Sequence, residues 1–150
     1  MTMTWNNAKR GLLLVGLAAA SLSGCVLSEP VQGMASLTDT RWNLRSLDQG
    51  DTPSDAPAQP VQVEFGAQGA LGGQGGCNRL MGRYTIDEAG LQVGDLAMTK
   101  RACIQGMDWD NRLGEVLSQS KGWRIQDQML QLLDAQGNSL ATFDAEPSAD

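Results

Sequence analysis

The side chains that could do chemistry in this 150-residue sequence are three cysteines and 17 acidic residues, because the chain contains no histidine. Without histidine, neither a Ser-His nor a Cys-His pair can activate a nucleophile, and no zinc ion can bind an imidazole ligand. Neighbouring acids occur at Asp87-Glu88 and at Asp108 and Asp110, and a carboxylate pair can act as general acid and base. The first pair lies in a predicted turn and the second in the first turn of a predicted helix, where acids stabilise the helix dipole. We therefore predict that the protein is not an enzyme and has no catalytic residue, metal ion or cofactor.

Cys25 lies at the end of a segment that has the order of an export signal. Two basic residues precede an apolar run, and small residues then lead into Leu22-Ser23-Gly24-Cys25. The apolar stretch over residues 11–24 has 14 residues, whereas a membrane-spanning helix needs about 20. The last four residues resemble a bacterial lipobox, in which the cysteine sulfur carries a diacylglycerol and cleavage makes that cysteine the new N-terminus. We predict a lipoprotein signal peptide over residues 1–24 and lipid on Cys25; the alternative is an ordinary signal peptide with a chance cysteine.

Cleavage before Cys25 changes the charge of the protein. It removes Lys9 and Arg10 and leaves 126 residues with 9 basic and 17 acidic side chains, a formal charge of −8 against −6 for the whole chain. Nucleic-acid binding needs clustered basic residues, so this acidic body predicts no nucleic-acid partner. The residue after the cysteine is Val26 and not Asp, which by resemblance to Gram-negative lipoproteins favours the outer membrane. We therefore expect a monomeric envelope protein, anchored by lipid to the outer membrane and facing the periplasm.

The other two cysteines, Cys77 and Cys103, are left as an even pair once Cys25 carries lipid. In an oxidising compartment we predict a disulfide between them. The bridge would enclose about 27 residues, for which the chain-entropy model gives about 3.5 kcal/mol of stabilisation. The alternative is two buried, reduced thiols that pack as small hydrophobic side chains.

Alternating apolar residues predict that most of the domain is β-sheet. The period of two is clearest in residues 40–47 and 61–65, and proline and glycine make residues 48–60 a loop. The five glycines of residues 69–76 are not followed by the Lys-Ser/Thr of a phosphate-binding loop, so we predict a bent or bulged strand with close backbone approach. The remaining predicted strands cover residues 83–86, 91–99, 123–125, 129–133 and 140–143.

One segment, residues 107–119, has a helical period instead. Its apolar positions are spaced i, i+4, i+7 and i+8, and they are Trp109, Leu113, Val116 and Leu117. This spacing predicts one amphipathic helix, with Asp108 as its N-cap. We interpret the apolar stripe as core rather than as a ligand site. The predicted domain covers residues 37–144, between a lipid-anchored tether (25–36) and a polar tail (145–150).

Basic residues lie close in the sequence to both Cys77 and Cys103. A disulfide would join the two segments and bring these residues together. We therefore predict a binding patch made of Arg79, Arg83, Tyr84, Lys100 and Arg101. The alternative is that the arginines are solvated side chains on a strand surface.

Several short motifs follow one another over residues 37–143. They are Trp42-x-Leu44, Phe65 before the glycine-rich stretch, Gly76-Cys77-Asn78, Gly82-x-Tyr84, Leu96-Ala97-x-Thr99 with Ala102-Cys103, and Leu130-x-Leu132. Their order resembles the META domain family, whose bacterial members include heat-shock lipoproteins of the HslJ type; one departure is Leu80, where many members carry an aromatic residue. The resemblance implies an α+β, mostly β fold: a small curved antiparallel sheet or partly open barrel with one amphipathic helix packed on it. It also implies an envelope or stress-related role, linked in some members to antibiotic tolerance or secretion, and no catalytic site.

Together these features predict a lipid-anchored, non-catalytic binding module of the cell envelope, active in stress response or antibiotic tolerance. Its partner would be an envelope protein or a small amphiphile, bound on one sheet face or at a strand edge. Two alternatives remain. One is a purely structural role in envelope stability, and the other is inhibition of a cell-wall hydrolase or protease, since an acidic domain suits a basic enzyme.

Overall fold

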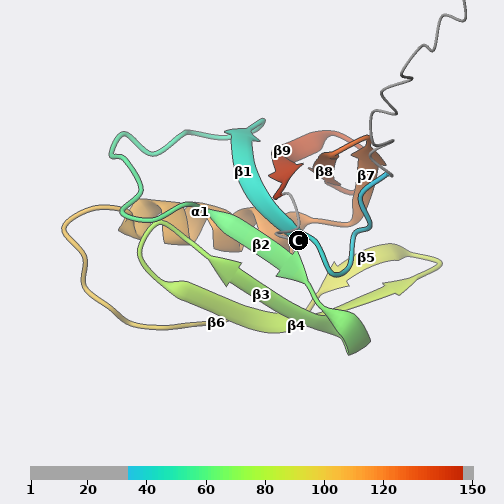
Figure 1. Ribbon diagram of the computed structural model, residues 1–150, viewed down its shortest axis with the longest axis horizontal. Coiled ribbons are helices and arrows are strands. Elements are labelled where there is room, and N and C mark those ends of the chain that lie inside the picture. The colour runs from blue at the N-terminus through green and yellow to red at the C-terminus, as the bar shows by residue number, and fades with distance from the viewer. Residues whose placement is uncertain (1–33, 147–150) are drawn as a thin grey trace, which may run out of the picture. The chain divides into compact units, whose positions relative to one another are not determined.

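The computed structural model of the protein describes residues 34–146, which form nine β-strands and one α-helix (Figure 1). The predicted signal peptide, the lipid attachment at Cys25 and most of the predicted tether and tail lie outside the described residues. The elements, in chain order, are β1 (Arg41–Leu47), β2 (Gln62–Phe65), a short 3-10 helix η1 (Ala67–Gly69), β3 (Ala70–Gln74), β4 (Arg79–Asp87), β5 (Gly90–Val93), β6 (Ala97–Met98), α1 (Met107–Gln119), β7 (Gly122–Gln126), β8 (Met129–Leu133) and β9 (Ser139–Ala145).

The strands form one antiparallel sheet in the order β5-β4-β3-β2-β1-β9-β8-β7, with the short β6 paired to β4. Its two end strands meet, because the backbone N–H of Leu91 in β5 donates a hydrogen bond of 2.9 Å to the carbonyl oxygen of Lys121, just before β7. The sheet therefore curls into a nearly closed barrel. This confirms the predicted fold class, a mostly β protein with a partly open barrel and a single helix.

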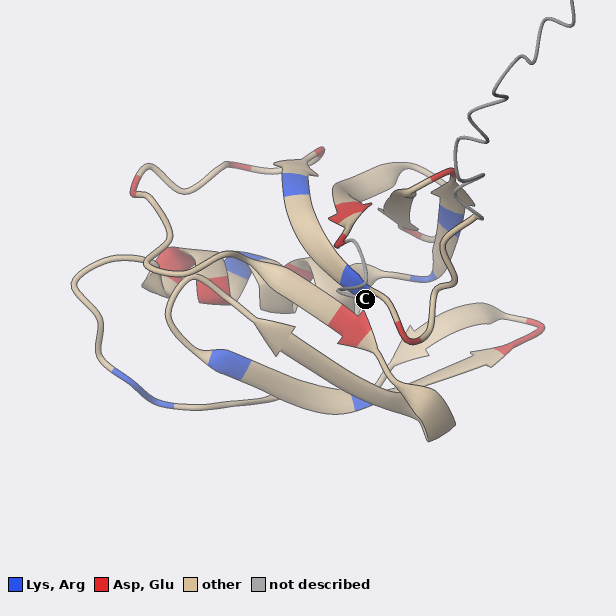
Figure 2. Ribbon diagram, viewed as in Figure 1, with Lys and Arg blue, Asp and Glu red and all other residues tan. Residues whose placement is uncertain are grey.

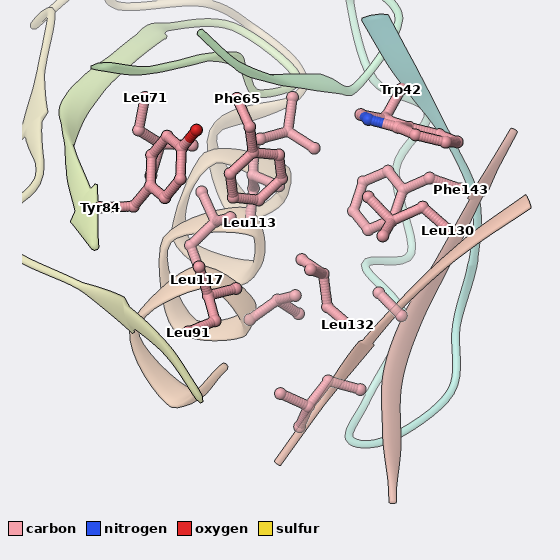
Figure 3. Close-up of a cluster of buried hydrophobic side chains, with 14 of the residues drawn as sticks. Trp42, Phe65, Leu71, Tyr84, Leu91, Leu113, Leu117, Leu130, Leu132 and Phe143 are labelled. Carbon is pink, nitrogen blue, oxygen red and sulfur yellow. The ribbon is translucent and has the colours of Figure 1, made fainter. Parts of the chain in front are cut away.

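The helix packs against the inner face of this sheet through the predicted apolar stripe. Leu113, Val116 and Leu117 are buried, and Trp109 is half-buried. Figure 3 shows Leu113 and Leu117 pointing into a cluster of side chains from the strands. The largest fully buried members of that cluster are Trp42, Phe65 and Phe143. The interpretation of the stripe as core is therefore confirmed.

The segment predicted as one strand over residues 91–99 is divided between β5 and β6. The two strands pair with successive parts of β4, and the break lies beside Gly82, where a Cβ atom would come within 2.7 Å of the Leu96 side chain. Leu96 packs against the core at this point. The chain therefore leaves the ladder at residues 94–96 and rejoins β4 closer to its start, and β4 itself begins at Arg79 rather than at residue 83.

The glycine-rich segment forms a regular strand, β3, whose pairings with β2 and β4 show no register shift. The predicted bulge is therefore wrong. The predicted close approach is confirmed, and it occurs just after the strand: a Cβ atom on Gly75 would overlap Asp110, and one on Gly76 would overlap the carbonyl oxygen of Gly106. Two consecutive glycines let the chain pass directly against the start of the helix.

The carboxylate of Asp48 ties the end of β1 to β9. Asp48 accepts hydrogen bonds from the hydroxyls of Ser139 (2.5 Å), Thr142 (2.7 Å) and Ser46 (2.7 Å). Partial burial alone would raise the pKa of Asp48, but the three donors stabilise the charged form and hold the pKa below its ordinary value of 3.8. A carboxyl group whose pKa is lower in the folded state stabilises the fold above its unfolded pKa, and this stabilisation is lost as the pH falls through the folded value.

Replacing Asp48 with Asn should lower the free energy of unfolding at neutral pH by about 1 kcal/mol, because a neutral amide makes weaker hydrogen bonds with these hydroxyls. The difference from wild type should shrink as the pH falls through the lowered pKa of Asp48, where the carboxylate of the folded protein becomes protonated. Urea unfolding at a series of pH values measures both effects. Asp51→Asn is the control, because Asp51 makes no hydrogen bond to any residue of 34–146, and it should leave stability at neutral pH unchanged. A difference that stays constant down to low pH would contradict the prediction.

Candidate functional site

The structure divides the predicted binding patch among three places. Arg79 and Arg83 lie on the outer face of β4, where exposed and buried residues alternate. Figure 2 shows basic positions along β4 and in the loop between β6 and α1. The guanidinium of Arg83 donates a hydrogen bond of 2.7 Å to the carbonyl oxygen of Gln68. The guanidinium of Arg79, in contrast, has no polar partner within residues 34–146. Of the two guanidinium groups, that of Arg79 is therefore the one without a partner in the described residues.

Tyr84 lies on the opposite, inner face of β4. It is buried, its ring packs edge-on against Phe65 with centroids 5.2 Å apart, and its hydroxyl donates a hydrogen bond of 3.0 Å to the carbonyl oxygen of Gly66. Burial, helped by the nearby charge of Asp39, raises the pKa of Tyr84 above its ordinary value of 10.0. Tyr84 is thus a neutral core residue, and the structure does not bring it to the surface beside the arginines.

Lys100 and Arg101 lie in a loop over residues 99–106, which we call the basic loop and which joins β6 to α1. Both residues are exposed, and neither side chain has a polar partner in the described part of the chain. The backbone N–H of Thr99 donates a hydrogen bond of 3.0 Å to the carbonyl oxygen of Arg79, so this loop starts beside β4. Lys100 and Arg101 nevertheless border a different depression from the one that Arg79 borders.

Arg79 borders a shallow groove of about 600 Å³ on the outer face of the sheet. We call it the outer groove, and its main lining residues are Arg41, Gln62, Glu64, Gly72, Gln74 and Arg79. The strand register places them in two neighbouring rows, because Gln62, Gln74 and Arg79 lie opposite one another, as do Arg41, Glu64 and Gly72. Gly72 is the floor: a Cβ atom there would have no other atom within 4 Å.

The outer groove offers hydrogen-bonding groups and a free cation. Within the described residues, the side chains of Gln62, Glu64 and Arg79 make no hydrogen bond or ion pair. Arg41 pairs with Glu146 at 3.1 Å, and both side chains are exposed. Because exposed ion pairs contribute about 1 kcal/mol or less, a ligand can replace Glu146 at Arg41. The geometry suits a ligand that places an anionic group at Arg79 and polar groups over Gly72.

A disulfide joins Cys77 to Cys103, with an S–S distance of 2.04 Å and Cα atoms 6.1 Å apart. The structure thus contains the predicted pairing. Cys77 is fully buried in the connection between β3 and β4. The bridge therefore anchors the basic loop to the interior of the domain.

A buried carboxylate organises the same region. Asp110 is only 2% exposed, and its Oδ1 accepts hydrogen bonds from the backbone N–H groups of Cys77 (2.9 Å) and Asn78 (2.8 Å). Its Oδ2 accepts a third, of 2.8 Å, from the Asn78 side-chain amide. The interpretation of Asp110 as a helix-dipole acid missed these contacts. The available signal was the glycine pair before Cys77-Asn78, because a glycine run marks a place where another group comes close to the backbone.

The start of the helix differs from the prediction. The N-cap is Gly106, with a φ of 91°, and not Asp108. A Cβ atom at position 106 would lie too close to the carbonyl group of Gly76, so only glycine fits between the two segments. The Gly106 N–H donates a hydrogen bond of 2.6 Å to Asp55 Oδ2. A side chain from the loop over residues 48–60, far from the helix in the sequence, thus binds the N-cap residue.

Two further findings concern the described residues as a set. In residues 34–146, no three His, Cys, Asp or Glu side chains gather closely enough to hold a metal ion. The single helix in this range is also too short and too polar to cross a membrane.

Replacing Asp110 with Ala should lower the free energy of unfolding by about 3 kcal/mol or more, because it leaves three buried N–H donors without an acceptor. The control is Asp108→Ala, in the same helical turn but exposed, which should cost about 0.5 kcal/mol through the helix dipole. Denaturant unfolding of the disulfide-bonded protein measures both. Equal losses for the two variants would show that the Asp110 hydrogen bonds add nothing to the free energy of unfolding beyond the effect of an acid on the helix dipole.

Comparisons with known proteins agree with this fold. The family model of the META domain matches residues 35–147. An NMR structure of a protein from Burkholderia xenovorans is similar with a TM-score of 0.60 and 26% sequence identity, covering 74% of this chain and 84% of that one. A second NMR structure, similar in fold, has a TM-score of 0.54 and 22% identity, covering 74% and 95%. Among curated proteins, none matches this sequence. Because the family model spans most of the chain, the protein belongs to the META domain family.

Proposed function

We propose that the protein is a lipid-anchored, non-catalytic binding module of the cell envelope, and that its ligand binds in the outer groove. The observation that carries this proposal is the guanidinium of Arg79, which has no partner within residues 34–146 and lies at the rim of a groove whose floor is Gly72. A guanidinium without a protein partner, beside open polar surface, is suited to pair with a carboxylate or phosphate of a ligand.

The proposed location rests on the sequence. The basic, apolar and small-residue order of residues 1–24, followed by Cys25, supports export and lipid attachment. Membership of the META domain family, which includes heat-shock lipoproteins, supports a role in envelope stress or antibiotic tolerance. The presence of Val26, and not an aspartate, directly after Cys25 supports sorting to the outer membrane.

The shape of the outer groove favours an extended protein segment or the head of a small amphiphile as ligand. The groove is shallow and open, and it crosses the strands β2, β3 and β4 rather than entering the core. A face is favoured over a strand edge because β5 and β7, at the ends of the sheet, come together through the Leu91–Lys121 hydrogen bond. A ligand on the face contacts side chains such as Gln62 and Arg79 instead of the unpaired backbone N–H and C=O groups of an edge strand.

Two substitutions in the outer groove test this proposal. Gly72→Val places a side chain in space that is free of atoms, and valine suits a strand, so it should block the groove while the domain still folds. Arg79→Ala removes the free cation. Each should weaken saturable capture of the partner from cross-linked envelopes by about tenfold or more. For Arg79→Ala this is the loss expected for one charge-assisted hydrogen bond, and for Gly72→Val it results from the side chain that occupies the ligand's space.

Arg83→Ala is the matched control, because Arg83 lies on the same face of β4 but already donates to Gln68. It should capture the partner as well as wild type does. Equal capture by all variants would exclude the outer groove as the site. Capture of only random, non-saturable neighbours by wild type would favour the purely structural role in envelope stability.

A further inference from the structure

Lys100 is exposed in the basic loop, while hydrogen bonds to the interior of the domain fix the residue on each side of it. We propose that this loop binds the active site of a serine protease that cleaves after basic residues, with Lys100 in the specificity pocket, and that the protein inhibits the protease instead of being degraded. The proposal does not depend on ligand binding in the outer groove, which is a different surface.

A protease must first reach the peptide bond that it attacks. Lys100, Arg101 and Ala102 are exposed, and Ile104 is fully exposed at 104% of its reference area. Lys100 makes no hydrogen bond to any described residue, through either its side chain or its backbone. Figure 1 shows the basic loop running out past β6 and back to α1, at the opposite end of the view from β7. The loop is therefore open to a large partner.

The side chain of Asn78 holds both residues that flank Lys100. Its Oδ1 accepts hydrogen bonds from the Thr99 hydroxyl (2.8 Å) and from the Arg101 backbone N–H (2.7 Å), and its Nδ2 donates one of 3.2 Å to the Arg101 carbonyl oxygen. Asn78 is itself fixed by Asp110. The disulfide at Cys103 fixes the chain two residues further on. The loop thus has the low flexibility that lowers the entropic cost of binding.

The same hydrogen bonds distinguish Lys100 from Arg101 as the residue that enters the protease. The carbonyl oxygen of Arg101 is turned inward to Asn78, so its carbon is poorly placed for attack from outside. The carbonyl group of Lys100 makes no hydrogen bond within residues 34–146. The peptide bond between Lys100 and Arg101 is therefore the one that a protease would attack.

Inhibition follows from what happens to the two new chain ends. The serine hydroxyl of the protease adds to the Lys100 carbonyl carbon, the bond to the Arg101 nitrogen breaks, and the serine proton passes through the enzyme's histidine to the Arg101 amine. In an ordinary substrate that amine leaves and water takes its place. Here Asn78 and the disulfide keep the amine beside the acyl ester. The amine attacks the ester, re-forms the peptide bond and returns the proton to the serine, so the reverse reaction competes with hydrolysis.

The test is titration of trypsin with the intact, disulfide-bonded protein. We expect inhibition that saturates at one molecule per trypsin, with a dissociation constant of about 1 μM or lower, and at most one cleavage, between Lys100 and Arg101, by mass spectrometry. Lys100→Ala should weaken inhibition by about 100-fold or more, because it removes the side chain that fills the pocket. Lys100→Leu should transfer inhibition from trypsin to chymotrypsin, whose pocket is hydrophobic.

Two other variants separate the loop from the rest of the surface. Thr99→Val changes the volume little and removes two hydrogen bonds of the Thr99 hydroxyl, the one that it donates to Asn78 and the one that it accepts from the Arg79 backbone N–H. It should speed cleavage after Lys100, because the residue before Lys100 is then no longer tied to Asn78. Arg83→Ala should inhibit as wild type does. The proposal is overturned if a large excess of wild type leaves trypsin fully active, if wild type is cut at many sites without inhibiting, or if Lys100→Ala inhibits as well as wild type.

Discussion

The arrangement of both candidate surfaces depends on the buried carboxylate of Asp110. A buried charge is costly unless hydrogen bonds satisfy it, and here all three donors come from two neighbouring residues, Cys77 and Asn78. To deliver them, the connection between β3 and β4 must lie directly against the first turn of α1, which is why glycine is needed at positions 75 and 76. The outer groove includes the two strands that this connection joins, and the side-chain amide of the same Asn78 holds the basic loop.

Most of the fold was predictable because nearly every strand has one face in a single core. Alternation located β1 and β2, and four apolar positions at helical spacing located the whole of α1. Alternation says which face a residue occupies but not which strand lies beside it. The break at residues 94–96, where the chain leaves β4 and then pairs with an earlier part of it, was therefore invisible in the sequence. So was the start of β4 at Arg79, since glycines and polar residues obscure the pattern there.

The candidate site was predictable only where the signal is local. The pairing of Cys77 with Cys103 follows from their number and compartment, and Arg79 and Arg83 share a face because they are four residues apart on one strand. The same parity puts Tyr84, which is adjacent to Arg83 on this strand, on the other face. The partners of Asp110 lie 32 and 33 residues away, and the outer groove needs the register of four strands. Both result from distant pairings that no short window of sequence contains.

The place of β9 between β1 and β8 has a consequence for how the chain acquires its structure. β1 is the first strand of the domain and β9 the last, so that Trp42 pairs with Ala145, about 100 positions later. The barrel cannot be completed until nearly the whole domain has been synthesised, and a topology with such distant pairings folds slowly. A growing chain of this kind cannot close its barrel while it leaves the ribosome. An incompletely folded chain is the state that an export machinery needs if residues 1–24 direct it across a membrane.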